Sequence, residues 1–162
     1  MRHGYPGRVN ELGSNGTTWD SARYLREVLR APVYEAAQHT PLQVMAGLSA
    51  RLGNTVEAKR EDLQPVHSFK IRGAYNAMRA LSDAERSRGV VTASAGNHAQ
   101  GVALSAQKLG CEATIVMPET TPQIKVDAVK SRGGKVVLHG TSYNDAYDHA
   151  MRLVAQSGLT YI

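Results

Sequence analysis

The sequence predicts an α/β fold with an open parallel sheet and flanking helices, and three observations carry this prediction. Short apolar runs with strand character recur from residue 55 to the end of the chain. Helical stretches separate consecutive runs, as the crossovers between parallel strands require. The chain has 162 residues, of which 42% are hydrophobic and 20% charged, a size and composition typical of one globular domain with a core.

The first part of the chain predicts a leader and then a helix. Residues 1–18 are rich in glycine and lack an apolar stretch, which indicates a flexible leader and excludes a signal peptide. From Thr18 onward apolar residues recur at helical spacing, and Pro32 ends the pattern. The residues that share this apolar face are Tyr24, Leu25, Val28 and Leu29. We expect residues 19–162 to form one folded region.

A second helix is expected to begin at Thr40. Thr40 is a suitable capping residue and Pro41 suits the first turn, while Gly53 and Asn54 end the run. The apolar residues at helical spacing in this stretch are Leu42, Met45, Leu48 and Leu52.

From residue 55 the strand and helix patterns alternate. The strand-like runs are residues 55–60, 89–94, 113–118, 135–140 and 159–162, and the helical stretches are residues 69–80, 97–109, 122–132 and 142–157. All these runs are expected in one parallel sheet covered by helices. Ligands of such sheets bind at the carboxyl ends of the strands, so loops at these ends are the first places to search for a site.

Charge and cysteine content narrow the class of protein. The net charge is +5, but the basic residues are spread from Arg2 to Arg152, which is typical of a solvated surface and argues against a nucleic-acid partner. No apolar stretch is long enough to cross a bilayer. The single cysteine, Cys111, cannot form an internal disulfide, which favours a cytoplasmic protein, and its position indicates a buried apolar role.

The first candidate site follows the strand at 89–94. The sequence Ser94-Ala95-Gly96-Asn97-His98 leads from that strand directly into a helix. Free backbone N–H groups and the positive end of the helix dipole converge in such a loop, which suits a carboxylate or another small anion. A plain tight turn, with Asn97 as the helix cap, would have the same sequence.

The second candidate is Lys70, in the sequence Ser68-Phe69-Lys70-Ile71. Ser68 suits a helix cap, which places Lys70 in the first turn, where the helix dipole opposes a positive charge. We expect Phe69 and Ile71 to remove water from the amine, which further favours its neutral form. A neutral amine is the form that condenses with an aldehyde. An ordinary solvated lysine is the alternative.

Other chemistries find little support. The histidines show no metal-ligand spacing with carboxylates or Cys111, so no metal site is expected. The G-x-S-x-G sequence of acyl-transfer enzymes does not surround Ser94.

On the two motifs Ser68–Ala74 and Ser94–Gly101, the chain resembles the threonine dehydratases, also called threonine ammonia-lyases. These are pyridoxal-phosphate enzymes of the tryptophan-synthase-β-like fold, also called fold type II. The resemblance extends from about Tyr24 to the last residue. Residues 25–38 and 64–67 are similar to the biosynthetic form of the isoleucine pathway. The resemblance implies that threonine is converted to 2-oxobutanoate and ammonia, and serine to pyruvate.

The resemblance also implies roles for individual residues. Lys70 matches the lysine that holds pyridoxal 5'-phosphate covalently and then removes the Cα proton of the substrate. Phe69 matches a residue beside the cofactor ring, and Asn97 the amide that binds the cofactor 3-hydroxyl. The substrate carboxylate is expected at the positions Ser94, Ala95, Gly96 and His98.

Two details refine this expectation. The similar serine racemases have a second serine where this chain has Ala95, so racemisation is not expected. The family's glycine-rich phosphate loop, the residue at the pyridine nitrogen and the regulatory domain have no counterpart in this sequence. We therefore expect the amino-terminal part of a catalytic domain, with small-domain β-α units over about 89–158, inactive alone and oligomeric when full length. A cysteine synthase-like β-replacement enzyme and a non-catalytic anion-binding module are the alternatives.

Overall fold

The computed structural model describes residues 20–162, so the leader predicted over residues 1–18 lies outside the described residues. The chain divides into two compact units, residues 1–31 and 32–162. In the first unit, helix α1 (Ser21–Arg30) begins after Asp20, whose carboxylate accepts the N–H of Arg23 at 2.6 Å. Helix α1 ends before Pro32, which confirms the predicted boundary. Proline disfavours helical conformation in the residue that precedes it.

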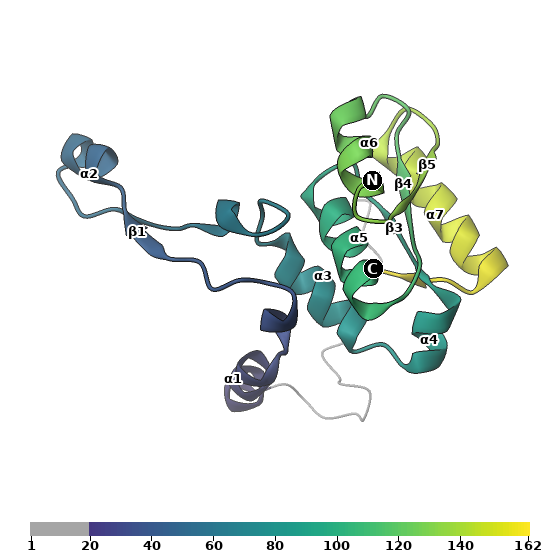
Figure 1. Ribbon diagram of the computed structural model, residues 1–162, viewed down its shortest axis with the longest axis horizontal. Coiled ribbons are helices and arrows are strands. Elements are labelled where there is room, and N and C mark those ends of the chain that lie inside the picture. Colours follow the sequence, from purple (N-terminus) through teal and green to yellow (C-terminus); the bar gives the residue numbers. More distant parts are fainter. Residues whose placement is uncertain (1–19) are drawn as a thin grey trace, which may run out of the picture. The chain divides into compact units, whose positions relative to one another are not determined.

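The second unit is built on a four-stranded parallel sheet, which confirms the predicted fold class (Figure 1). Its strands are β3 (Val90–Ala93), β4 (Ala113–Met117), β5 (Lys135–Leu138) and β6 (Thr160–Tyr161), in the spatial order β5-β4-β3-β6. All three neighbouring pairs are parallel. Each of these strands lies within a run that the sequence predicts.

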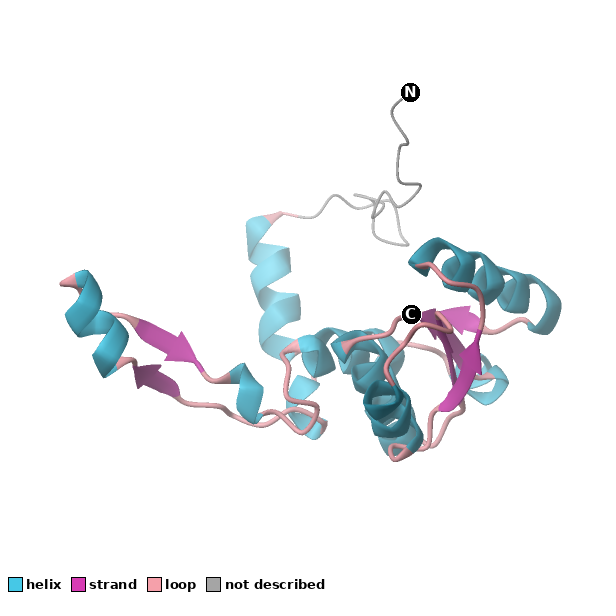
Figure 2. Cartoon of the chain, turned by 90° about the horizontal axis from the view of Figure 1, so that it is seen from above, coloured by secondary structure: helices cyan, strands magenta, loops and turns pink. Residues whose placement is uncertain are grey.

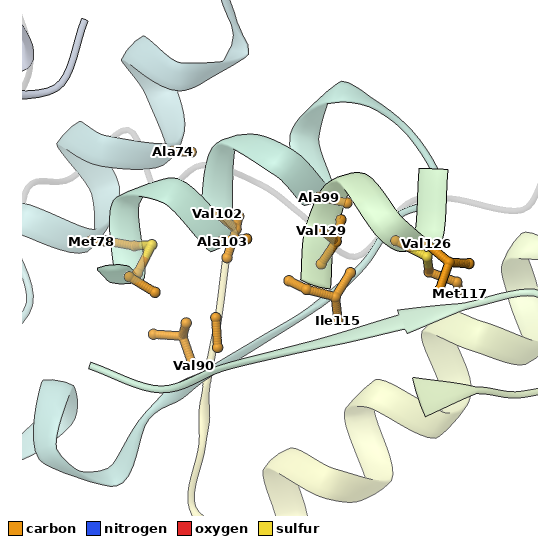
Figure 3. Packing of buried hydrophobic residues seen from close by; sticks show 12 residues of the cluster. Ala74, Met78, Val90, Ala99, Val102, Ala103, Ile115, Met117, Val126 and Val129 are labelled. Carbon is orange, nitrogen blue, oxygen red and sulfur yellow. The ribbon is translucent and has the colours of Figure 1, made fainter. Parts of the chain in front are cut away.

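Helices cover both faces of this sheet (Figure 2). Helices α5 (Asn97–Leu109) and α6 (Gln123–Lys130) pack on one face, where their apolar side chains meet Val90, Ile115 and Met117 (Figure 3). Helix α7 (Tyr143–Ser157) packs on the other face, with Ala146 and Ala150 against Val91 and Val116. Alternate residues of β3 and β4 thus serve opposite faces, which explains why each strand is apolar apart from one threonine.

Helix α3 (Lys70–Arg79) joins this core to a smaller apolar cluster. Its Ala74 and Met78 belong to the core beneath α5, whereas Ile71 and Tyr75 pack with residues 36–37 and Val66. The short 3-10 helix η1 (Val33–Glu35) directly precedes residues 36–37 of that cluster, and a second one, η2 (Glu61–Leu63), lies shortly before Val66.

Helix α4 (Asp83–Arg88) is absent from the sequence prediction, although the sequence contains its start signal. Ser82 accepts the N–H of Glu85, and the Glu85 carboxylate accepts the N–H of Ser82. This reciprocal capping box explains why so short a polar segment is helical.

The prediction for residues 40–60 is wrong in three respects. Residues expected at the start of a helix instead form strand β1 (Leu42–Val44), and helix α2 (Ala46–Leu52) begins only after it. Thr40 does not cap a helix, because its hydroxyl donates to the Glu61 carboxylate at 2.5 Å. The run at 55–60 forms β2 (Glu57–Lys59), which pairs antiparallel with β1 and stands apart from the parallel sheet. Pairing between distant segments overrides the helical spacing of the leucines.

Candidate cofactor and substrate site

Lys70 is the first residue of helix α3 and has an exposed side chain. The predicted removal of water from its amine is not seen in this chain, because Phe69 is 58% exposed and Ile71 is fully buried in the core. Successive residues of a helix point about 100° apart, so a buried Ile71 leaves Lys70 facing outward. The Lys70 amine lies 5.1 Å from the centre of the Phe69 ring, within the range of a cation–π contact.

The loop Ser94–Gly96 connects the carboxyl end of β3 to the first residue of α5. The backbone N–H of Ser94 donates to Val116, and the Ser94 hydroxyl accepts the N–H of Gly96 at 3.3 Å. Gly96 is the residue that precedes the helix, and no side chain caps it. The interpretation of Asn97 as a helix cap is therefore wrong, since Asn97 is the first helical residue and is exposed.

The open start of helix α5 is suited to bind an anion. The first N–H groups of any helix lack an intrahelical acceptor, and here no side chain supplies one. Helix α7 differs, because Ser142 and Asp145 form a capping box at its start. The N–H groups of Asn97, His98 and Ala99 therefore offer donors and the positive end of a helix dipole to a carboxylate.

Close packing of α3 against α5 brings the two motifs together. A Cβ atom at Gly101 would lie 3.3 Å from the carbonyl oxygen of Lys70 and 3.4 Å from Cβ of Ala74. These distances show that the α5 backbone contacts the first turn of α3 directly. Because Gly101 has no side chain, helix α5 can lie directly beside the start of helix α3. Helix α5 follows the Ser94–Gly96 loop, and the start of α3 carries Lys70.

His98 takes part in fixing the start of α5 to the sheet. Its Nε2 lies 3.2 Å from the carbonyl oxygen of Ile162, which also accepts the Thr92 hydroxyl at 2.7 Å. Because a carbonyl oxygen only accepts, Nε2 carries the proton in this contact. His98 thus bonds to the backbone just after β6.

The residues present suit part of a pyridoxal-phosphate site. Within residues 20–162 Lys70 takes part in no ion pair, so its amine has no acidic partner to displace. The exposed Phe69 ring offers an apolar surface and the exposed Asn97 an amide. With the uncapped start of α5, these groups match the aldehyde, ring, hydroxyl and carboxylate of a cofactor–amino-acid pair.

A polar network anchors the first turn of α3, and the sequence analysis missed it. Arg72 donates two hydrogen bonds to the Glu61 carboxylate, of 2.8 Å from Nε and 2.9 Å from Nη2. Thr40 and the buried Gln64 also donate to Glu61. The hydrogen bonds from Arg72 lower the pKa of Glu61 to about 2, although partial burial acts in the opposite direction. The run of charged residues at 59–62, two basic and then two acidic, is the available sequence signal, but it does not identify Arg72 as the partner of Glu61.

The sequence and the fold can now be compared with known proteins. Residues 33–162 match the family described as pyridoxal-phosphate dependent enzyme. The chain belongs to this family. Within residues 20–162, no helix is both long and apolar enough to span a bilayer.

Several similar proteins are threonine dehydratases. The chain is 57% identical over 143 residues to the biosynthetic L-threonine dehydratase IlvA of Salmonella typhimurium, a match that covers 88% of this chain and 28% of that protein. The solved threonine deaminase isoform 2 of Solanum lycopersicum superimposes with a TM-score of 0.85 at 54% identity, covering 90% of this chain and 41% of that one. Maize serine racemase superimposes with a TM-score of 0.80 at 36% identity, covering 85% and 42%. The chain therefore spans less than half the length of these relatives.

Proposed function

We propose that this chain is the lysine-bearing part of a biosynthetic threonine dehydratase, which converts L-threonine to 2-oxobutanoate and ammonia and L-serine to pyruvate. This reaction is the first step of isoleucine biosynthesis. The observation that carries the proposal is the packing of Gly101 against Lys70, which joins the amine-bearing helix start to the uncapped start of α5. The identity to biosynthetic threonine dehydratases supports the choice of substrate.

Each residue has a proposed task at this site. The Lys70 amine holds the cofactor covalently, and once released it takes the Cα proton of the substrate onto Nζ. The backbone N–H groups at the start of α5 and the loop Ser94, Ala95, Gly96, His98 bind the substrate carboxylate. Phe69 packs against the cofactor ring and Asn97 binds its hydroxyl. When bound, pyridoxal phosphate supplies the electron sink that stabilises the negative charge at Cα.

Ala95 supports elimination over racemisation. An alanine at this loop position has no hydroxyl to deliver a proton to the second face of Cα. We propose Lys70 as the group in this part of the protein that takes the Cα proton, which suits loss of the β-hydroxyl. The likeness to serine racemase is thus proposed to concern the fold and the lysine, not the reaction.

We propose the following organisation for the whole protein. Residues 19–162 belong to the catalytic domain, with the small-domain β-α units at about 89–158. The phosphate-binding loop and a regulatory domain would belong to the remainder that the longer relatives contain. We propose a cytoplasmic, homo-oligomeric full-length enzyme, which light scattering and fluorescence microscopy of a tagged protein would test.

A chimaera tests the proposed reaction. Residues 1–162 are joined to the remaining carboxyl-terminal part of the Salmonella typhimurium threonine dehydratase, and 2-oxobutanoate is measured with threonine as substrate. We expect activity in the chimaera, loss of at least 10³-fold in Lys70→Ala, and little change in the matched variant Lys108→Ala. No activity in the soluble, cofactor-loaded chimaera would refute the proposal.

The two alternatives predict different results for the same chimaera in other measurements. A β-replacement enzyme would consume serine faster when sulfide is added and would form cysteine. A non-catalytic anion-binding module would retain its ligand binding in Lys70→Ala. The 162-residue chain without the remainder is expected to bind pyridoxal phosphate weakly and to release no 2-oxobutanoate.

A further inference from the structure

The start of helix α3 is only weakly capped. Phe69, which precedes Lys70, already has helical backbone angles and its side chain makes no capping hydrogen bond. Ser68 provides one long contact, a 3.3 Å hydrogen bond from the Lys70 N–H to its hydroxyl. A weakly capped helix start frays readily, so Lys70 at this position needs another source of order.

The side chain of Arg72 supplies that order. Arg72 lies in the first turn of α3 and binds Glu61 with the two parallel hydrogen bonds of a fork-shaped pair. Its Nη2 also donates to the carbonyl oxygen of Gln38 at 3.3 Å, and its guanidinium lies 5.2 Å from the centre of the Tyr34 ring. The first turn is thus tied to Glu61 and to the segment 34–38.

Glu61 is in turn held by its neighbours. Besides Arg72 it accepts hydrogen bonds from Thr40 and Gln64, and Gln64 is bound to both backbone groups of Gln38 at 2.8 Å. The side chains of Arg72 and Glu61 are 24% and 17% exposed, so water screens this pair less than an open surface pair. The pair is therefore shorter and better shielded from water than the Arg79–Glu35 pair at the other end of α3, whose side chains are 46% and 50% exposed.

We propose that Glu61 and Arg72 are positioning residues that fix the first turn of α3 and so set the place of the Lys70 amine relative to the start of α5. Helix α5 also contacts this turn of α3, through Gly101. This inference rests on the proposed function, because it takes Lys70 as the residue that reacts with the cofactor aldehyde. Neither Glu61 nor Arg72 needs to touch the cofactor for this role.

The test measures how fast Lys70 reacts, using the 162-residue chain and pyridoxal phosphate. The amine condenses with the aldehyde, water leaves, and borohydride reduces the C=N bond to a stable secondary amine that peptide mass spectrometry locates. The exposed Lys108 of α5 serves as an internal reference in every sample. In the unchanged chain we expect Lys70 to be labelled at least tenfold faster than Lys108 without reaching full occupancy.

Variants of the pair separate positioning from stability. We expect Glu61→Gln and Arg72→Lys to reduce the Lys70 to Lys108 labelling ratio about tenfold, because each removes the two parallel hydrogen bonds. Glu35→Gln, which weakens the other ion pair of α3, is expected to change the ratio less than twofold. Urea unfolding and circular dichroism identify any variant that does not fold. If Glu61→Gln proves too unstable, Arg72→Lys still tests the pair, because it keeps the positive charge.

The outcomes distinguish this inference from the proposed function. Preferential labelling of Lys70 that persists in folded Glu61→Gln and Arg72→Lys would overturn the positioning role alone. Equal labelling of Lys70 and Lys108 in the unchanged chain would overturn the positioning role in this chain, whereas the reaction itself is judged by the chimaera assay. A loss of stability without a change in the labelling ratio would assign the pair a purely structural role.

Discussion

Gly101 of helix α5 lies directly against the carbonyl oxygen of Lys70 in helix α3, so close that a Cβ atom at residue 101 would be 3.3 Å from it. This contact connects the helix start that carries the candidate lysine to the helix that follows the Ser94–Gly96 loop. Its neighbours are backbone atoms and Ala74, which cannot move aside by a change of rotamer. The separation of the two helices is therefore sensitive to the size of this residue.

Enlarging residue 101 should separate α3 from α5. We expect Gly101→Val to lower the free energy of unfolding by about 1–3 kcal/mol through overpacking. Gly73→Ala is the matched control on α3, because a Cβ there meets nothing within 4 Å, and it should raise stability by about 0.5–1 kcal/mol. Urea denaturation of both variants is the measurement, and equal stabilities would contradict the close contact.

Acid should weaken the fold through Glu61. Its pKa is lowered in the folded chain from an ordinary value of 4.5 to about 2 by the hydrogen bonds from Arg72, so the carboxylate contributes stability above pH 4.5. That contribution, at most about 3 kcal/mol, is lost as the pH falls from 4.5 through 2. Urea denaturation at pH 7 and pH 2.5 should show a smaller acid-induced loss in Glu61→Gln than in the unchanged chain. Equal losses would show that the pair is not formed in solution.

Small carboxylates should bind at the start of α5 but not at the start of α7. We expect millimolar threonine to shift the backbone amide NMR signals of Asn97, His98 and Ala99, because no side chain caps this helix. The amides of residues 143–145 are the internal control, since Ser142 and Asp145 already form a capping box there. Shifts of similar size at both helices would indicate a non-specific effect of the added solute.

Shortening a side chain at the centre of the sheet should lower the stability of the fold. Ile115 of β4 is fully buried beneath α5 and α6, and Ile115→Ala is expected to lower the free energy of unfolding by about 2–5 kcal/mol. Ile124 of α6 is 78% exposed, so Ile124→Ala should change it by less than about 0.5 kcal/mol. Denaturant midpoints compare the two variants, and a small effect at Ile115 would be inconsistent with the packing seen here.

Local sequence patterns were sufficient for the parallel sheet and its crossover helices. The runs around Val90, Ile115 and Val136 are apolar on both faces, and the helices between them carry clear caps or periodicity. Interactions between residues close in sequence are therefore enough to predict whether each segment is a strand or a helix. Local patterns also identified Lys70 and the Ser94–Gly96 loop as candidate site residues, because each lies at a predicted helix start. Helix α4 was also predictable from Ser82 and Glu85 but was missed.

Contacts between distant residues decided the remaining features. Leu42 has helical spacing to its neighbours, yet it is extended because it pairs with Lys59. Strand β6 lies beside β3 rather than beside β5, which precedes it in sequence, and no local pattern encodes that order. The links of Gly101 to Lys70 and of Glu61 to Arg72 likewise depend on where whole helices lie. Periodicity and capping reflect the energetics of a few adjacent residues, whereas packing selects partners across the whole chain.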